Sequence, residues 1–313
     1  MTIGEIMPVY IAYRQSLGEK FKNNRNILCS FCRYVGEDCG LALINRDIVS
    51  DFLYAPKGMV TSNWFSKYTA LKGFYTWALS RGYVKEIPLQ QVLPKRPDHI
   101  TPYIYSNSEL KSLFDSALTY QRRKGHMIPY VTQTILVITY TLGLRIHETL
   151  DLKLEDIDMY ESLTVIRESK FYKSRIVPFG KKVGCRFAEY LEWRKKNGYP
   201  QGEKSALFVD DRGHPVNIHT FSSCFKHIRK KAGISRNDGG RFQPRIQDLR
   251  HTFATNRLVT WYTEQKDVQS LLPLLSSYLG HTQLSHTSVY LSMIPELLKE
   301  ACKLCLLYTS DAA

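Results

Sequence analysis

Four short motifs between residues 143 and 290 of this 313-residue sequence combine arginine, lysine, histidine and tyrosine. They are "GLRIHE" with Arg145 and Glu148, "SKFYKSRIVP" with Lys170, "QDLRHTFAT" with Gln247, Arg250 and His251, and "LGHTQLSHTSVY" with His281 and Tyr290. Two guanidinium groups can bind the oxygens of a phosphodiester in fork geometry. A tyrosine hydroxyl becomes a nucleophile when cations lower its pKa and a neighbour accepts its proton. The residue types together suit attack on a phosphodiester.

Each motif taken alone also has a structural explanation. Arg145 follows a strongly apolar segment that ends at Gly143, and an arginine there needs an anionic partner or many hydrogen bonds. Glu148 can be that partner. Lys170 lies beside the tip of an expected hairpin, where a lysine is usually only solvated. The structural and the chemical explanations therefore both stay open for the single motifs.

The charge of the chain favours a polyanionic partner. Lys and Arg number 43 against 29 Asp and Glu, which gives a net charge of +14. Such an excess is most often explained by nucleic acid. No segment approaches the ~20 uninterrupted apolar residues of a membrane span, and residues 1–15 lack the layout of a signal peptide. We therefore expect a cytoplasmic protein with no membrane partner.

The seven cysteines are expected to be free thiols, since disulfides are rare in the cytosol. Cys29, Cys32 and Cys39 form the tightest cluster, but a second ligand pair at zinc-site spacing is missing. We predict that they pack in a helical core and hold no metal. The sequence also lacks a Gly-rich phosphate loop and a spaced carboxylate cluster for two metal ions, so no cofactor is expected.

The order of the expected elements divides the chain into two domains. Apolar residues at helical spacing predict helices within 24–38, 45–54 and 62–84, and Asn45 is the expected N-cap of the second. Prolines with little periodicity then mark a linker. The expected boundaries are 1–90 for a helical domain, 91–103 for the linker and 104–304 for the second domain.

The second domain is expected to be mainly α with a small β-sheet (α+β). Ser106 and Glu109 form a capping box, and a buried helix runs from Pro129 to a left-handed stop at Gly143. Two β-rich runs, 163–169 and 174–179, read as a hairpin, and helical patterns return beyond about 181.

In their order and spacing, "GLRIHE", "SK…RIVP", "DLRHTFAT" and "LGH…VY" resemble the active-site motifs of the tyrosine recombinase (phage integrase) family. The resemblance covers about 103–300 and extends less specifically to the N-terminal helices, which look like the family's SAM-like core-binding domain. It implies a helical core-binding domain and a catalytic domain that form a C-shaped clamp around DNA.

The resemblance also implies a role for each residue of the motifs. Arg145 and Arg250 would hold the scissile phosphate, Lys170 would protonate the leaving 5′ oxygen, His281 would contact the phosphate, Tyr290 would be the nucleophile, Glu148 would brace the first arginine and His251 would support the second. Lys67, Lys72 and Arg81 on the helix within 62–84 either form a solvated edge or lie along a DNA backbone.

Two features depart from the family pattern. Gln247 stands where the family usually has a histidine, and glutamine can donate a hydrogen bond but cannot transfer protons at neutral pH. We predict that Gln247 works as a donor. The segment between Arg250 and His281 is longer than in compact members and is expected to hold an added turn or loop around 260–267. This length favours a recombinase of a transposon or integrative element.

The resemblance implies a metal- and ATP-independent site-specific recombinase of a mobile element in a prokaryotic cytoplasm, associated with the nucleoid. It would bind double-stranded DNA as a homotetramer, be a monomer when free, and work with accessory recombinases or directionality factors. A type IB topoisomerase-like nicking-closing enzyme and a catalytically decayed DNA-binding regulator are the alternatives. Residues 305–313, "CLLYTSDAA", read like a translated sequencing adapter, and we expect them not to belong to the native fold.

Overall fold

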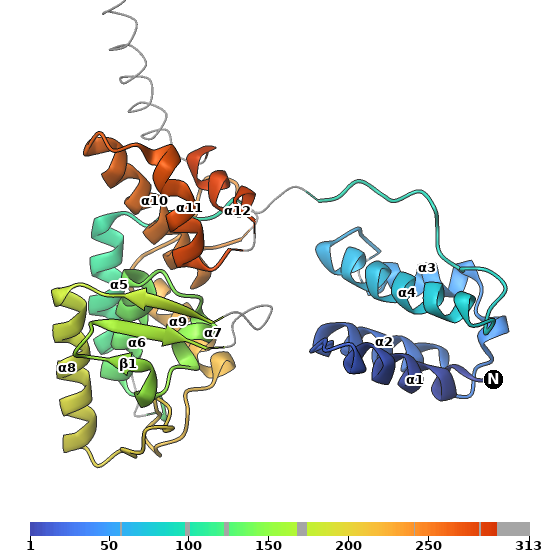
Figure 1. Cartoon of the computed structure of the whole chain (residues 1–313), viewed down its shortest axis with the longest axis horizontal. Coiled ribbons are helices and arrows are strands. Elements are labelled where there is room, and N and C mark those ends of the chain that lie inside the picture. Colours follow the sequence, from blue (N-terminus) through green and yellow to red (C-terminus); the bar gives the residue numbers. More distant parts are fainter. Residues whose placement is uncertain are drawn as a thin grey trace, which may run out of the picture. The chain divides into compact units, whose positions relative to one another are not determined.

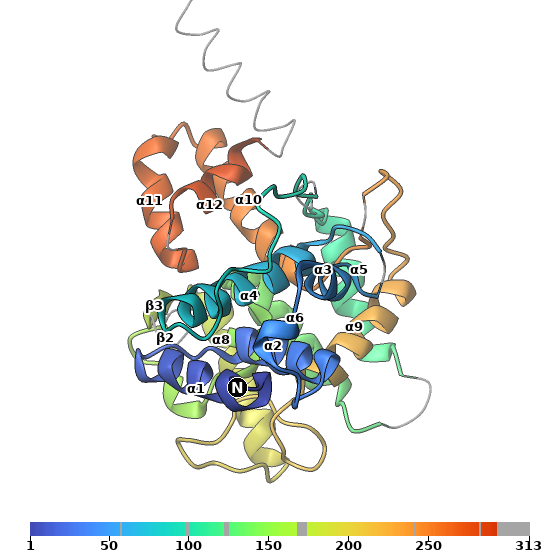
Figure 2. The same cartoon turned by 90° about the vertical axis from the view of Figure 1, so that its right-hand side faces the viewer.

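The computed structural model describes residues 1–56, 58–97, 101–121, 125–167, 174–240, 242–281 and 283–292. The chain separates into two compact units, Met1–His99 and Ile100–Ala313, which Figures 1 and 2 show from two sides. The structure is mainly helical with one small three-stranded sheet, and this confirms the predicted fold class. None of the helices within these ranges is long and apolar enough to cross a membrane.

The N-terminal unit is a group of helices around one apolar core. Its elements are α1 (Ile3–Ser16), α2 (Lys22–Val35), the 3-10 turn η1 (Leu41–Leu43), α3 (Arg46–Tyr54) and α4 (Ser62–Ser80). The Asn45 side chain accepts a hydrogen bond from the Ile48 N–H at 3.0 Å and caps α3 as predicted. Cys32 is buried in the core of this unit.

The long helix α4 supplies the centre of this core. The residues that it buries recur at three- and four-residue steps, and they include Trp64, Tyr68, Leu71, Phe74, Tyr75 and Ala78. Large aromatic side chains bury much apolar surface and dominate core energetics. The helical spacing of these residues in the sequence therefore predicts the inward face of α4 correctly.

The second unit places its helices around a three-stranded antiparallel sheet. Its elements are α5 (Asn107–Thr119), α6 (Pro129–Thr141), α7 (Ile146–Leu150), η2 (Leu154–Asp156), β1 (Ile157–Asp158), β2 (Leu163–Ile166), β3 (Arg175–Pro178), α8 (Lys181–Lys196), α9 (Ile218–Lys231), α10 (Gln247–Thr263), α11 (Val268–Leu279), α12 (Ser285–Ser288) and η4 (Val289–Ser292). The strand order is β1-β2-β3, and the register pairs Leu163 with Pro178 and Ile166 with Arg175. The predicted hairpin is present, but its tip with Lys170 lies outside the described residues.

Two glycine turns position the chain segments that carry the motif residues. Gly143, with φ +59°, ends α6 and leads into α7, and Gly280, with φ +67°, ends α11 just before His281. A Cβ atom on Gly143 would lie 2.3 Å from the Phe253 side chain, so this turn is packed directly against α10. Only glycine satisfies both the left-handed backbone and the close approach at Gly143.

The long segment before His281 is two helices joined by a short turn. Helix α10 continues to Thr263, and α11 begins at Val268. Asp267 caps α11 by accepting hydrogen bonds from the N–H groups of Gln269 and Ser270. A turn therefore lies within the range 260–267 in which the sequence predicts an added turn or loop, and the rest of the segment is helical.

Candidate active site

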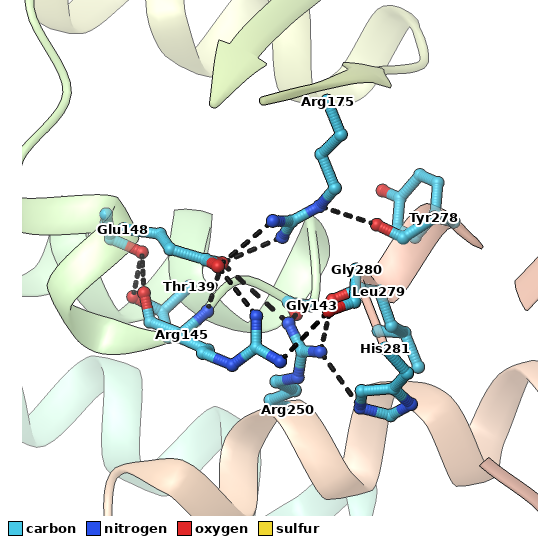
Figure 3. Close-up of polar contacts among 11 residues, drawn as sticks. Thr139, Gly143, Arg145, Glu148, Arg175, Arg250, Tyr278, Leu279, Gly280 and His281 are labelled. Atoms are coloured by element: carbon cyan, nitrogen blue, oxygen red, sulfur yellow. Dashed lines mark hydrogen bonds and ion pairs between the residues drawn. The ribbon is translucent and has the colours of Figure 1, made fainter. Parts of the chain in front are cut away.

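The buried carboxylate of Glu148 lies at the centre of a group of three arginines (Figure 3). Arg145 Nη1 donates to Oε1 at 2.8 Å, and Arg175 donates from Nη1 to Oε1 at 3.0 Å and from Nη2 to Oε2 at 2.7 Å. Arg250 Nη1 lies 3.8 Å from Oε2. Burial alone would raise the pKa of Glu148, but the hydrogen bonds and charge of Arg175 outweigh it and lower that pKa to about 2. Glu148 is therefore an anion that orients the arginines.

Arg145 is the most accessible arginine of this group. It precedes α7, its N–H donates to Glu148 Oε2 at 3.0 Å, and its Nη2 donates to the Gly280 carbonyl at 3.3 Å. Its side chain is 25% exposed, against 10% for Arg175 and 1% for Arg250. An anion that approaches the cluster from solvent therefore meets Arg145 first.

Arg250 is buried at the point where three chain segments meet. Nη1 donates to the Gly143 carbonyl at 3.0 Å, and Nη2 donates to the Leu279 carbonyl and, at 3.1 Å, to His281 Nε2. Burial, followed by the positive charge of Arg145, lowers the pKa of Arg250 to about 9. Three guanidiniums around one carboxylate leave positive charge that the cluster itself does not neutralise.

The hydrogen bonds of His281 assign its neutral tautomer. A guanidinium nitrogen can only donate, so Nε2 of His281 accepts from Arg250. The ring proton is then on Nδ1, which donates to Thr287 Oγ1 at 2.7 Å. His281 is thereby oriented from both sides, with Nε2 facing the arginine cluster.

Tyr290 lies in η4 with its hydroxyl beside α10. It is 3% exposed, and its Oη is 3.0 Å from His251 Nδ1. The rings of His281 and Tyr290 are nearly parallel, at 24°, with centroids 6.3 Å apart. Burial raises the pKa of Tyr290, while the charges of Arg250 and Arg145 act in the opposite direction. The site therefore needs a proton acceptor for Tyr290 to act as a nucleophile near neutral pH.

The structure thus brings six of the predicted residues into one cluster, namely Arg145, Glu148, Arg250, His251, His281 and Tyr290. Gln247 is half-buried at the start of α10, and its side chain makes no hydrogen bond to a described residue. Lys170 lies outside the described residues, so its role stays a prediction. The catalytic roles of the other residues are likewise proposals.

Arg175 is a member of the cluster that the sequence reasoning did not identify. It begins β3, and its Nε donates to the Tyr278 carbonyl at 2.8 Å in addition to its two bonds to Glu148. The available signal was a charged residue at the start of a short β-rich run, "RIVP". That signal is weak, because an arginine at the start of a strand usually faces solvent.

The cations that the sequence suggested as DNA contacts on α4 lie in different environments. Lys67 Nζ donates to the carbonyls of Phe52, at 2.6 Å, and Ala55, at 3.0 Å, and burial lowers its pKa. Lys72 is exposed, and Arg81 lies over the rings of Tyr13 and Trp77. Lys67 therefore has an internal structural role, and DNA contact by these three residues stays a prediction.

Within the described ranges, no group of three or more His, Cys, Asp or Glu side chains could hold a metal ion. The clustered residues Cys29, Cys32 and Cys39 are free thiols that pack in or against the N-terminal core.

Comparisons with known proteins agree with this fold. Residues 106–295 match the model of the phage integrase family. The chain is 30% identical to the integrase/recombinase y4rB of Sinorhizobium fredii over 304 residues, which is 96% of each chain. It is 32% identical to the tyrosine recombinase XerC of Bacillus pumilus over 251 residues, 78% of this chain and 74% of that one. The chain belongs to the phage integrase family of tyrosine recombinases.

Solved structures of this class share the fold. The integrase of transposon Tn1549, solved with transposon right end DNA, matches with a TM-score of 0.68 at 16% identity, covering 97% of this chain and 98% of that one. A lambda integrase dimer bound to a core site matches with a TM-score of 0.65 at 17% identity, covering 91% of this chain and 97% of that one. At these identities the likeness concerns the fold alone.

Proposed function

We propose that this protein is a site-specific DNA recombinase of a mobile element that cuts and rejoins DNA through a 3′-phosphotyrosyl intermediate on Tyr290. The observation that carries the proposal is the convergence of an excess of guanidinium charge with a tyrosine hydroxyl in one cluster. Arg145, Arg175 and Arg250 surround one carboxylate, and Tyr290 contacts the adjacent His251. A scissile phosphate would supply the missing negative charge.

Each residue of the cluster has a defined part in the proposed cleavage. Arg145 and Arg250 bind the non-bridging oxygens and stabilise the charge that develops in the transition state. Tyr290 Oη attacks phosphorus, and the bond from phosphorus to the 5′ oxygen breaks. Lys170 gives that oxygen its proton, and His281 contacts the phosphate. Because the phosphotyrosyl bond keeps the energy of the broken bond, a 5′ hydroxyl of a second duplex can rejoin the strand without ATP, a metal or another cofactor.

DNA binding is proposed to involve both units of the chain. The net charge of +14 would neutralise backbone phosphates and release their counterions. By analogy with the solved DNA complexes of the Tn1549 and lambda integrases, the two units would close as a C-shaped clamp on a duplex. Four protomers on two sites would exchange strands through a Holliday junction, and the free protein would be a monomer.

A two-site recombination assay tests this function. The substrate is a plasmid that carries two copies of the sequence joining the element to its flanking DNA, recovered from the source genome. We expect a recombinant product and a branched junction intermediate. Relaxation of supercoils by the monomer without recombinants would indicate the topoisomerase-like alternative. Binding without any covalent product would indicate a decayed regulator and contradict the proposal.

A further inference from the structure

We propose that His251 is a catalytic residue of this protein and that its Nδ1 accepts the Tyr290 proton during strand cleavage. The inference rests on the proposed function, in which Tyr290 is the nucleophile. It assigns to His251 the proton transfer that Gln247 cannot perform. An amide side chain can donate and accept hydrogen bonds, but it does not take up a proton at neutral pH.

The side chains of His251 and Tyr290 are in direct contact. His251 Nδ1 and Tyr290 Oη are 3.0 Å apart, within the range over which a general base removes a proton directly. The ring centroids are 5.5 Å apart, with the planes inclined at 55°. Tyr290 is 3% exposed, so bulk water has little access to its hydroxyl. His251 therefore replaces solvent as the group beside the hydroxyl proton.

Helix α10 positions His251 together with a proposed phosphate-binding residue. Arg250 and His251 are consecutive on α10, and consecutive helical side chains project about 100° apart. Arg250 points to the carbonyls of Gly143 and Leu279, and His251 points to Tyr290. One helical turn thus supplies the phosphate-binding cation and the base of the nucleophile. This arrangement couples the two functions through a single rigid element.

Other proton acceptors near Tyr290 are already engaged in hydrogen bonds. Both ring nitrogens of His281 make hydrogen bonds, one with Arg250 and one with Thr287. The Glu148 carboxylate accepts from Arg145 and Arg175. Gln247 makes no hydrogen bond to the described part of the cluster. Nδ1 of His251 is already hydrogen-bonded to the nucleophile, and it is the basic atom in the tautomer that carries the ring proton on Nε2.

His251 is neutral at pH 7, as a base must be, although burial also makes the ring a weaker base. Burial lowers the pKa of His251 to about 4, so the ring is neutral at pH 7 and can accept a proton. The nearby Asp248 acts in the opposite direction and stabilises the imidazolium, while Arg245 and Arg250 disfavour it. Negative charge on the attacked phosphate would add to the effect of Asp248. Proton transfer is therefore expected to accompany formation of the oxygen–phosphorus bond.

The proposed step balances in atoms and charge. The bond from Tyr290 Oη to phosphorus forms while the phenolic proton moves to His251 Nδ1. The bond from phosphorus to the 5′ oxygen breaks, and that oxygen takes a proton from the general acid. In the rejoining reaction the imidazolium returns its proton to Tyr290 as the phenolate leaves. The same residue is therefore required in both directions.

The test is single-turnover cleavage of a nicked suicide duplex by the full chain and its His251→Ala and His251→Gln variants. General-base removal is expected to slow cleavage by about 10²- to 10⁴-fold. Duplex binding and thermal melting are measured for each variant. We expect imidazole added to His251→Ala to restore part of the rate, since it can occupy the vacated space and take the proton. His251→Gln has no such space and should stay slow.

A second substrate separates the base from the acid. Sulfur in place of the bridging 5′ oxygen makes a leaving group that needs no proton. This substrate should rescue Lys170→Ala, the matched control for leaving-group protonation, and should leave His251→Ala as slow as before. Cleavage by His251→Ala at the wild-type rate would overturn the proposal. A cleavage defect of His251→Ala that imidazole does not restore, or that the substrate with bridging sulfur relieves, would also overturn it.

The variant Tyr290→Phe distinguishes this inference from the function on which it rests. If Tyr290→Phe still forms a covalent adduct, the proposed function itself fails. If Tyr290→Phe forms none while His251→Ala cleaves normally, only the assignment to His251 fails. Imidazole must not restore Tyr290→Phe, because no nucleophile is present for it to activate.

Discussion

The guanidinium of Arg175 donates to both carboxylate oxygens of Glu148, at 3.0 and 2.7 Å, and Arg145 shares one of these oxygens at 2.8 Å. Arg175 lies on β3 and also donates to the Tyr278 carbonyl at the end of α11. It therefore joins the sheet, α7 and α11 around one buried carboxylate. This makes Arg175 a positioning residue, since it acts on the proposed phosphate site through Glu148.

We predict that Arg175→Ala lowers both stability and cleavage. Glu148 would keep Arg145 but lose its bidentate partner, and removing one member of a buried ion pair costs about 3 kcal/mol. Denaturant unfolding and single-turnover cleavage are the measurements. Arg175→Lys is the matched control, since lysine keeps the charge but cannot make the bidentate contact. Its stability and its cleavage rate should lie between those of the wild type and Arg175→Ala. An Arg175→Ala protein as stable as the wild type would contradict this role.

A matched pair of glycine substitutions tests the turn before α7. Gly143 and Gly233 each follow a helix, and both have positive φ, +59° and +71°. A Cβ added to Gly143 would lie 2.3 Å from the Phe253 side chain, whereas a Cβ added to Gly233 would meet nothing within 4 Å. Alanine costs about 1–2 kcal/mol from the left-handed backbone alone. We expect Gly143→Ala to cost about 1–3 kcal/mol more from overpacking. Equal losses in chemical denaturation would show that Phe253 does not constrain this turn.

Gly143→Ala should also impair cleavage, because the Gly143 carbonyl accepts from Arg250. Gly233→Ala lies outside the cluster and should keep the wild-type cleavage rate.

The two proposed phosphate-binding arginines should differ in their effect on stability. Arg145→Ala and Arg250→Ala are both expected to abolish cleavage while duplex binding, measured against salt, stays close to that of the wild type. Arg250 is 1% exposed and holds two backbone carbonyls, so its loss should also cost about 2 kcal/mol of stability. Arg145 is 25% exposed, so Arg145→Ala should cost less stability than Arg250→Ala. A variant that cleaves at the wild-type rate would remove that arginine from the mechanism.

The depressed pKa of His251 predicts a loss of stability in weak acid. The folded state holds the pKa near 4, whereas the ordinary value is 6.5, so the unfolded chain binds a proton first as the pH falls. Stability should therefore decrease from about pH 6.5 towards pH 4, by at most about 3 kcal/mol. The pKa of Glu148 is lowered from 4.5 to about 2, so this residue adds a further loss of stability as the pH falls from 4.5 towards 2. Melting temperatures of the wild type and His251→Gln across this range are the measurement.

His251→Gln should have the flatter profile between pH 6.5 and 4, since glutamine does not titrate there. Parallel profiles for the two proteins would show that His251 is not a buried neutral base.

The features that the sequence predicted correctly depend on residues close together in the chain. Asn45 caps α3, Ser106 and Glu109 form their capping box, and Gly143 adopts the left-handed turn. Each of these structures is determined within about one helical turn. The ordered motifs also predicted which side chains meet, because the family resemblance carries tertiary information that local propensity lacks.

The features that the sequence did not reveal depend on distant contacts. Arg175 finds Glu148 across 27 residues, and nothing in "SRIVP" indicates which partner a strand arginine will face. Lys67 is similar, since its ammonium binds carbonyls at the end of α3 rather than lying free on the helix surface. The contact between His251 and Tyr290 joins α10 to η4 across 39 residues. Periodicity places such side chains on a face but does not say what covers that face.

In the proposed function, Tyr290 forms the covalent bond to DNA. The most direct test is to trap the full chain on a nicked suicide duplex, digest the adduct and locate the modified residue by mass spectrometry. We predict a nucleotide-bearing phosphotyrosine at Tyr290 in the wild type and no denaturant-stable adduct in Tyr290→Phe, which should still bind the duplex. A nucleotide adduct on another residue, or an adduct that persists in Tyr290→Phe, would show that Tyr290 is not the nucleophile.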